Sequence, residues 1–260
     1  MTFTIRPASS PRAVRSLRRR LTIRLTALVV ALALPLGARA GWPPEAGAFR
    51  DALDAVESAD PPVEMESLFT TSAALQQALM QSDPLTGRVW LQDLAGDDFA
   101  ALSESLRGMR LARSPIPYAL PDALFLSELA QRQGRPEDRR FFRVYRQSWG
   151  LDPMPAWLRR TSRVLPCIRY GEGVISDLYE GWQGFARDYP GAYIDYVRLM
   201  LGEIEQTVAQ GGCACGNEDA VEQELSEFVT RFPNTPVRPA ILARLQELED
   251  DPERRPVQCR

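Results

Sequence analysis

The sequence contains no histidine among its 260 residues and no lysine, so all 31 basic residues are arginine. Without histidine there is no Ser-His-Asp or Cys-His nucleophile and no His-Glu-x-x-His zinc site. Without lysine there is no Ser-Lys dyad, no Schiff-base amine and no phosphate-loop lysine. Any catalysis would therefore depend on carboxylates or thiols, and we expect no cofactor and no metal.

Acidic residues are absent before Glu45, and this first stretch is rich in arginine. An apolar run over residues 25–36 follows the arginines, and Ala38-Arg39-Ala40 comes next. The run is shorter than the roughly 20 residues that a membrane-spanning helix needs. A basic head, a short apolar middle and a small-x-small exit are typical of a secretory signal peptide. We predict cleavage after Ala40, a periplasmic or secreted protein without a membrane span, and either general or twin-arginine export.

The predicted signal peptide carries eight of the 31 basic residues and none of the 34 acidic ones. The remaining chain has 23 basic and 34 acidic residues, a formal charge of −11. A negative balance of this size repels phosphate backbones, which excludes nucleic acid as a favoured partner. A protein partner is the expectation.

The chain has four cysteines, Cys167, Cys213, Cys215 and Cys259, an even number that predicts two disulfides in an exported protein. A bond between Cys213 and Cys215 would close a strained small ring. We favour Cys167–Cys213 with Cys215–Cys259, while Cys167–Cys215 with Cys213–Cys259 stays open. A redox pair is an alternative because the Cys-Ala-Cys stretch precedes a predicted helix. A zinc site is disfavoured because paired spacing is missing outside this stretch.

Apolar residues recur at helical spacing through residues 41–113 and again through residues 122–249. No segment shows the strict alternation of a half-buried strand. These patterns predict an all-α fold. One expected helix begins after Asp97-Asp98 and places Phe99, Leu102, Leu106 and Met109 on one face. Another spans residues 64–81, with a possible break at residues 70–72.

The stretch SPIPYALP over residues 114–121 holds three prolines and is the predicted connector between the two helical regions. Asp122 is expected to cap the next helix, and Pro136 occupies the first turn of the one after it. That second helix carries Phe141, Val144, Tyr145 and Ser148 on one side and Arg139, Arg143 and Arg146 on the other. We interpret the arginine row as a solvated face rather than an anion site. Residues 250–260 form a tail that Cys259 would tether.

The C-terminal region contains an internal repeat with a constant offset of 43 residues. WQGFARDYP over residues 182–190 matches LSEFVTRFP over residues 225–233. The aligned pairs are Trp182 with Leu225, Phe185 with Phe228, Tyr189 with Phe232, and Pro190 with Pro233. Proline ends each first helix, because the residue before it is disfavoured in helical conformation. The period predicts antiparallel helix hairpins that stack in a short solenoid.

The stretch FVTRFPNTPVRPAILARLQEL over residues 228–248 resembles the repeats of tetratricopeptide-like periplasmic proteins, such as outer-membrane assembly components. The resemblance covers residues 174–249 and implies the same general helix-hairpin architecture. The small residues that such helices use for close packing are replaced here by Tyr193, Tyr196 and Met200.

Five of the seven tyrosines lie between residues 170 and 196. The candidate interaction surface for a peptide or glycan comprises Tyr170, Tyr179, Tyr193 and Tyr196. The favoured alternative is a two-helix core built from large side chains. Carboxylates lie near these aromatics at Glu172, Asp177 and Glu180, and glycoside cleavage needs only two acids about 5–10 Å apart.

The leading hypothesis from the sequence is an exported, non-catalytic helical-repeat scaffold that binds a protein partner in the cell envelope. The repeat and the missing catalytic residue types motivate it. The alternatives are a carboxylate-based enzyme acting on glycan and a thiol–disulfide protein that uses Cys213 and Cys215.

Overall fold

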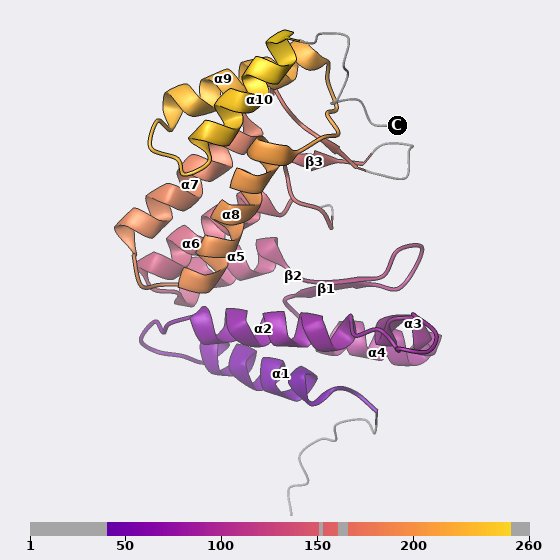
Figure 1. Ribbon diagram of the computed structural model, residues 1–260. Coiled ribbons are helices and arrows are strands. Elements are labelled where there is room, and N and C mark those ends of the chain that lie inside the picture. The colour runs from indigo at the N-terminus through magenta and orange to yellow at the C-terminus, as the bar shows by residue number, and fades with distance from the viewer. Residues whose placement is uncertain (1–40, 151–152, 161–165, 251–260) are drawn as a thin grey trace, which may run out of the picture. The chain divides into compact units, whose positions relative to one another are not determined.

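The computed structural model describes residues 41–150, 153–160 and 166–250, and their fold is mostly helical with a few short strands (Figure 1). The expected signal peptide, its cleavage site and Cys259 lie outside the described residues. The helices are α1 (Pro44–Glu57), α2 (Glu66–Leu79), α3 (Trp90–Asp93), α4 (Gly96–Ser105), α5 (Ala123–Gln133), α6 (Pro136–Ser148), α7 (Val174–Asp188), α8 (Ile194–Gln210), α9 (Glu218–Arg231) and α10 (Arg238–Asp250). The strands are β1 (Met109–Ala112), β2 (Tyr118–Pro121), β3 (Leu158–Arg159) and β4 (Cys167–Ile168).

Helices that follow one another along the chain pack together, α1 with α2, α5 with α6, α7 with α8 and α9 with α10. These pairs are joined to each other through contacts of α1 with α5, α6 with α7, α7 with α9 and α8 with α10. No single pair could bury its apolar face alone. The contacts between pairs therefore create the shared core.

The predicted absence of strands is wrong for residues 109–121. Here β1 and β2 pair antiparallel, with Met109 opposite Pro121 and Ala112 opposite Tyr118. The predicted connector 114–121 is thus the turn and second strand of a hairpin, and β2 packs on α2. Each strand is only four residues long, too short for an alternation pattern to stand out from the sequence. The second pair, β3 with β4, is two residues long on each side.

The helix expected to carry Leu106 and Met109 ends earlier than predicted. The last residue of α4 is Ser105, and Met109 already belongs to β1. Gly108 lies between them with φ +87°, a conformation that glycine adopts at little cost. A Cβ at this position would also lie 3.0 Å from the Phe125 ring. Helix α2, in contrast, runs unbroken through residues 70–72.

The predicted helix starts after the connector are confirmed. The Asp122 side chain accepts hydrogen bonds from the backbone N–H groups of Leu124 and Phe125, at 3.0 and 3.1 Å. Pro136 is the first residue of α6. The apolar side of α6 is buried, whereas Arg139, Arg143 and Arg146 are exposed, as expected for a solvated face.

Four of the five aromatic residues of the repeat are in the core. Trp182, Phe185 and Phe228 are fully buried and Phe232 nearly so, while Tyr189 is only half-buried. Helix α7 ends one residue before Tyr189 and α9 ends one residue before Phe232, so the aromatic-proline pair terminates both. The 43-residue offset therefore describes two helices with equivalent ends.

Candidate functional site

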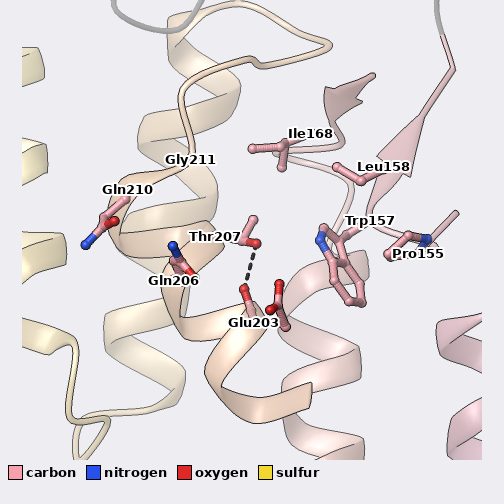
Figure 2. A pocket seen from close by; sticks show the side chains of 9 residues that line it. All are labelled: Pro155, Trp157, Leu158, Ile168, Glu203, Gln206, Thr207, Gln210 and Gly211. Atoms are coloured by element: carbon pink, nitrogen blue, oxygen red, sulfur yellow. Dashed lines mark hydrogen bonds between the residues drawn. The ribbon is translucent and has the colours of Figure 1, made fainter. Parts of the chain in front are cut away.

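A cavity of about 380 Å³ lies between α8 and the segment that contains β3 and β4 (Figure 2). Helix α8 and Gly211, which follows it, supply one wall. The opposite wall is mainly apolar. The residues that line it are Pro155, Trp157, Leu158, Ile168, Glu203, Gln206, Thr207, Gln210 and Gly211.

A disulfide between Cys167 and Cys215 holds the apolar wall in place, with the two Cα atoms 4.9 Å apart. The backbone N–H of Ile168 donates to the carbonyl oxygen of Cys213 at 2.6 Å. In return, the N–H of Cys215 donates to the carbonyl oxygen of Ile168 at 2.8 Å. The Cys-Ala-Cys stretch thus lies parallel to β4 and fixes Ile168 beside the cavity.

The favoured pairing of Cys167 with Cys213 is wrong, because Cys167 is bonded to Cys215. The hydrogen bond from the Cys215 N–H to Ile168 brings Cys215 next to Cys167, a register that only the folded backbone determines. Cys213 is disulfide-bonded as well. No cysteine in the described part of the chain has a free thiol. The bond to Cys259 remains a prediction.

Two side chains secure the C-terminal end of α8, where the cavity ends. The Tyr170 hydroxyl donates to the carbonyl oxygen of Thr207 at 2.8 Å. The Arg244 guanidinium donates to the carbonyl oxygens of Val208, at 2.8 Å, and of Gly211, and it stacks on the Tyr170 ring. These contacts satisfy carbonyl groups that a helix end leaves without partners. The last turn of α8 is therefore rigidly placed.

The helical wall presents polar groups that are available to a ligand. The side chains of Glu203, Gln206 and Gln210 form no hydrogen bond or ion pair with any other described residue. The Thr207 hydroxyl is already occupied, since it donates to the carbonyl oxygen of Glu203 at 2.7 Å (Figure 2). Within the described part of the chain, the cavity thus combines two unpaired carboxamides and one carboxylate with an apolar wall.

Three of the four tyrosines predicted to form an interaction surface are in the interior instead. Tyr170, Tyr179 and Tyr193 are buried because their helices and turns pack against neighbouring helix pairs. The Tyr179 hydroxyl donates to Glu205 at 2.5 Å, and burial raises the pKa of Tyr179 to about 12. This agrees with the favoured alternative of a core built from large side chains. Only Tyr196 is half-exposed.

Sequence reasoning missed the two buried carboxylates, and both have structural roles. The carboxylate of Asp138 accepts hydrogen bonds from the Tyr193 hydroxyl at 2.5 Å and from the backbone N–H groups of Arg135 and Met65, at 2.8 and 3.2 Å. Burial raises the pKa of Asp138. The sequence signal for the role of Asp138 is its position in the first turn of α6, because a carboxylate is favourable near a helix N-terminus.

The second buried carboxylate, Glu224 on α9, joins that helix to the start of α7. It accepts hydrogen bonds from the N–H groups of Gly171 and Gly173 and from the Ser176 hydroxyl, at 3.0, 3.2 and 2.8 Å. Buried acids of this kind need such partners, since an unpaired buried charge is strongly unfavourable. Neither acid is left to act as a catalytic base.

The Tyr193 contact can be tested alone. We expect Tyr193→Phe to lower the free energy of unfolding by about 1–2 kcal/mol, because Asp138 loses one of its three donors in a buried position. Urea unfolding followed by circular dichroism measures this. Tyr118→Phe is the control, since Tyr118 is half-exposed in β2. Equal effects of the two changes would contradict the structural role of the Asp138–Tyr193 bond.

The carboxylates proposed for glycan cleavage are engaged in surface ion pairs. Glu172 binds Arg169 and Arg159, and the hydrogen bond from Arg169 lowers the pKa of Glu172. Asp177 and Glu180 both bind Arg231. A lowered pKa is opposite to what a general acid needs. Each of the three acids is thus paired with an arginine, and Asp177 and Glu180 share the same one.

No group of three or more metal-ligating side chains gathers among the described residues. None of the described helices has the length and apolar character to cross a membrane. No family model, curated protein or solved structure matches the chain.

Proposed function

We propose that the protein is an exported, non-catalytic scaffold of the cell envelope that binds an extended peptide segment of a partner protein in the cavity beside α8. The observation that carries this proposal is the pair of free carboxamides, Gln206 and Gln210, opposite the apolar wall. The helix pairs would form a short solenoid similar to tetratricopeptide repeats. Repeat arrays of this kind commonly offer an extended binding surface.

The spacing of the two glutamines suits a peptide backbone. Residues four apart on a helix lie on one face, about 6 Å apart along its axis. Alternate residues of an extended peptide lie about 6.6 Å apart. Each carboxamide can donate and accept a hydrogen bond, as a peptide unit does. Gln206 and Gln210 can therefore pair with alternate peptide units, while the half-buried Pro155 and Leu158 contact apolar side chains of the ligand.

A glycan ligand fits the cavity less well than a peptide. A glycosidase needs two carboxylates, but Glu203 is the only acid among the described residues that line this cavity. Trp157 is only 4% exposed, so it offers no open ring face for stacking on a sugar. A thiol–disulfide activity is likewise disfavoured, because Cys215 is bonded to the buried Cys167.

The proposal predicts a defined loss of binding. Decapeptides can be selected from a displayed random library for binding to the protein from residue 41 onward. They should bind the Gln206→Ala, Gln210→Ala double variant about 10–30-fold more weakly than the wild type. Two lost hydrogen bonds of about 1 kcal/mol each give this range. Fluorescence anisotropy of the labelled peptides measures it.

Gln147→Ala is the matched control, because Gln147 is an exposed glutamine on α6 that does not line this cavity. All three proteins should share the same melting temperature, since the substituted side chains have no partner in the described chain. Full binding by the double variant would overturn the proposal.

A further inference from the structure

A second cavity, of about 290 Å³, lies at the other end of α8, where this helix meets α2. Its lining combines apolar side chains with two acidic ones. The residues that line it are Glu66, Phe69, Thr70, Ala73, Tyr193, Asp195, Tyr196 and Leu199. It shares no lining residue with the cavity of Figure 2, but both use α8.

The two cavities lie on one continuous face of α8. At 100° per residue, the positions of Asp195, Leu199, Glu203, Gln206 and Gln210 fall within about 80° of each other around the helix axis. All five side chains are exposed. These five side chains form a stripe along α8. From Asp195 to Gln210 the stripe is about 22 Å long, at 1.5 Å of rise per residue. A single ligand can therefore reach from one cavity to the other along the helix.

Gly202 lies beside this face, about 20° outside the arc of the five side chains, and between the two cavities along the helix axis. Glycine inside a helix is about 1 kcal/mol less favourable than alanine, so its presence there lowers the stability of α8. Nothing within the described chain requires it, since a Cβ at Gly202 would have no atom within 4 Å. The missing side chain leaves open space along one edge of the stripe, where a ligand backbone could approach the helix closely.

The second cavity has the chemistry to receive an apolar side chain next to a basic one. Leu199 is 56% exposed, a high value for a large apolar side chain, and it lies beside Phe69 and Ala73 in the lining. Glu66 and Asp195 form no ion pair with any described residue. Two carboxylates without an ion pair in the described chain, beside apolar side chains, are complementary to leucine- or phenylalanine-sized groups flanked by lysine or arginine.

We infer that one extended segment of a partner protein lies along α8 and fills both cavities. This inference rests on the proposed function. At about 3.3 Å per residue, seven or eight residues cover the 22 Å between the ends of the stripe. One end of the segment places a basic and an apolar residue between α2 and α8. The other end pairs its backbone with Gln206 and Gln210.

Gly202→Leu tests the continuous path without disturbing the fold. Because the site is open and leucine is a better helix former, the melting temperature should stay the same or rise. The selected decapeptides should bind this variant at least tenfold more weakly. Gly47→Leu is the matched control, since Gly47 on α1 also has open space around it, and it should leave affinity unchanged. Unchanged affinity for Gly202→Leu would overturn the inference.

The charge of the second cavity gives an independent test. The Glu66→Gln, Asp195→Asn double variant should bind the selected peptides about five- to tenfold more weakly at low salt, and the difference should shrink in 0.5 M NaCl, where charges are screened within about 4 Å. Asp51→Asn with Glu104→Gln, two exposed acids elsewhere, is the control. Peptides selected on the wild type should be enriched in a basic residue beside an apolar one, whereas peptides without this enrichment would count against the inference.

The two proposals can fail separately. If binding depends on Gln206 and Gln210 but not on Gly202, Glu66 or Asp195, the proposed function stands and the continuous path is wrong. If no decapeptide binds in a way that depends on Gln206 and Gln210, the proposed function falls, and the inference falls with it.

Discussion

Replacing both Cys167 and Cys215 by alanine should lower the free energy of unfolding by about 4 kcal/mol. Their disulfide joins residues 48 positions apart, and in the chain-entropy model a closed loop of this length constrains the unfolded chain by that amount. Chemical denaturation of the variant and the wild type under non-reducing conditions measures the difference. Alanine suits this test, because Cys167 is buried and serine would leave a polar group there.

The same variant should bind peptides more weakly, because the bond holds Ile168 in the wall of the cavity through the hydrogen bonds between β4 and the Cys-Ala-Cys stretch. Peptide mapping of the wild-type protein without reduction provides the control. It should recover Cys167 linked to Cys215, and we predict a second link between Cys213 and Cys259. A fragment joining Cys167 to Cys213 would contradict the structure. A stability loss below 1 kcal/mol would show that the bond contributes little.

The sequence allowed the helical core to be predicted where its signals were local. The aromatic-x-x-x-aromatic-proline pattern correctly marks the ends of α7 and α9, since proline and helical spacing act within a few residues. Asp122 and Pro136 mark helix starts for the same reason. The hairpin of β1 with β2 was missed because its stability depends on packing against α2, which is distant along the chain.

The site could be predicted only in part. The cysteines were identified as structural, but two cysteines separated by one residue are equally able to reach Cys167 until the backbone register is known. The tyrosines were clustered in sequence, yet whether each faces inward depends on which helix pairs stack. One usable signal was overlooked. Gln206 and Gln210 lie on α8 away from its buried residues Val197, Ile204 and Val208, a polar and uncharged pair on a solvent-facing side.

Phe228→Ala should lower the free energy of unfolding by about 3–5 kcal/mol, the usual range for a buried aromatic residue. Phe228 is fully buried on α9, and its ring lies 4.9 Å from that of Tyr179 on α7 and 4.8 Å from that of Phe232. The truncation therefore opens a cavity at the contact between two helix pairs. Urea unfolding measures the loss.

Phe99→Ala is the matched control, because Phe99 on α4 is only half-buried and should lose far less stability. The comparison decides whether the repeat is a structural unit or a coincidence of composition. If Phe228 is an equivalent of Phe185, as the 43-residue offset requires, Phe185→Ala should cost a similar amount, since that side chain is also fully buried. A loss under 1 kcal/mol for Phe228→Ala would show that Phe228 is not part of the core. The repeat would then have no physical basis.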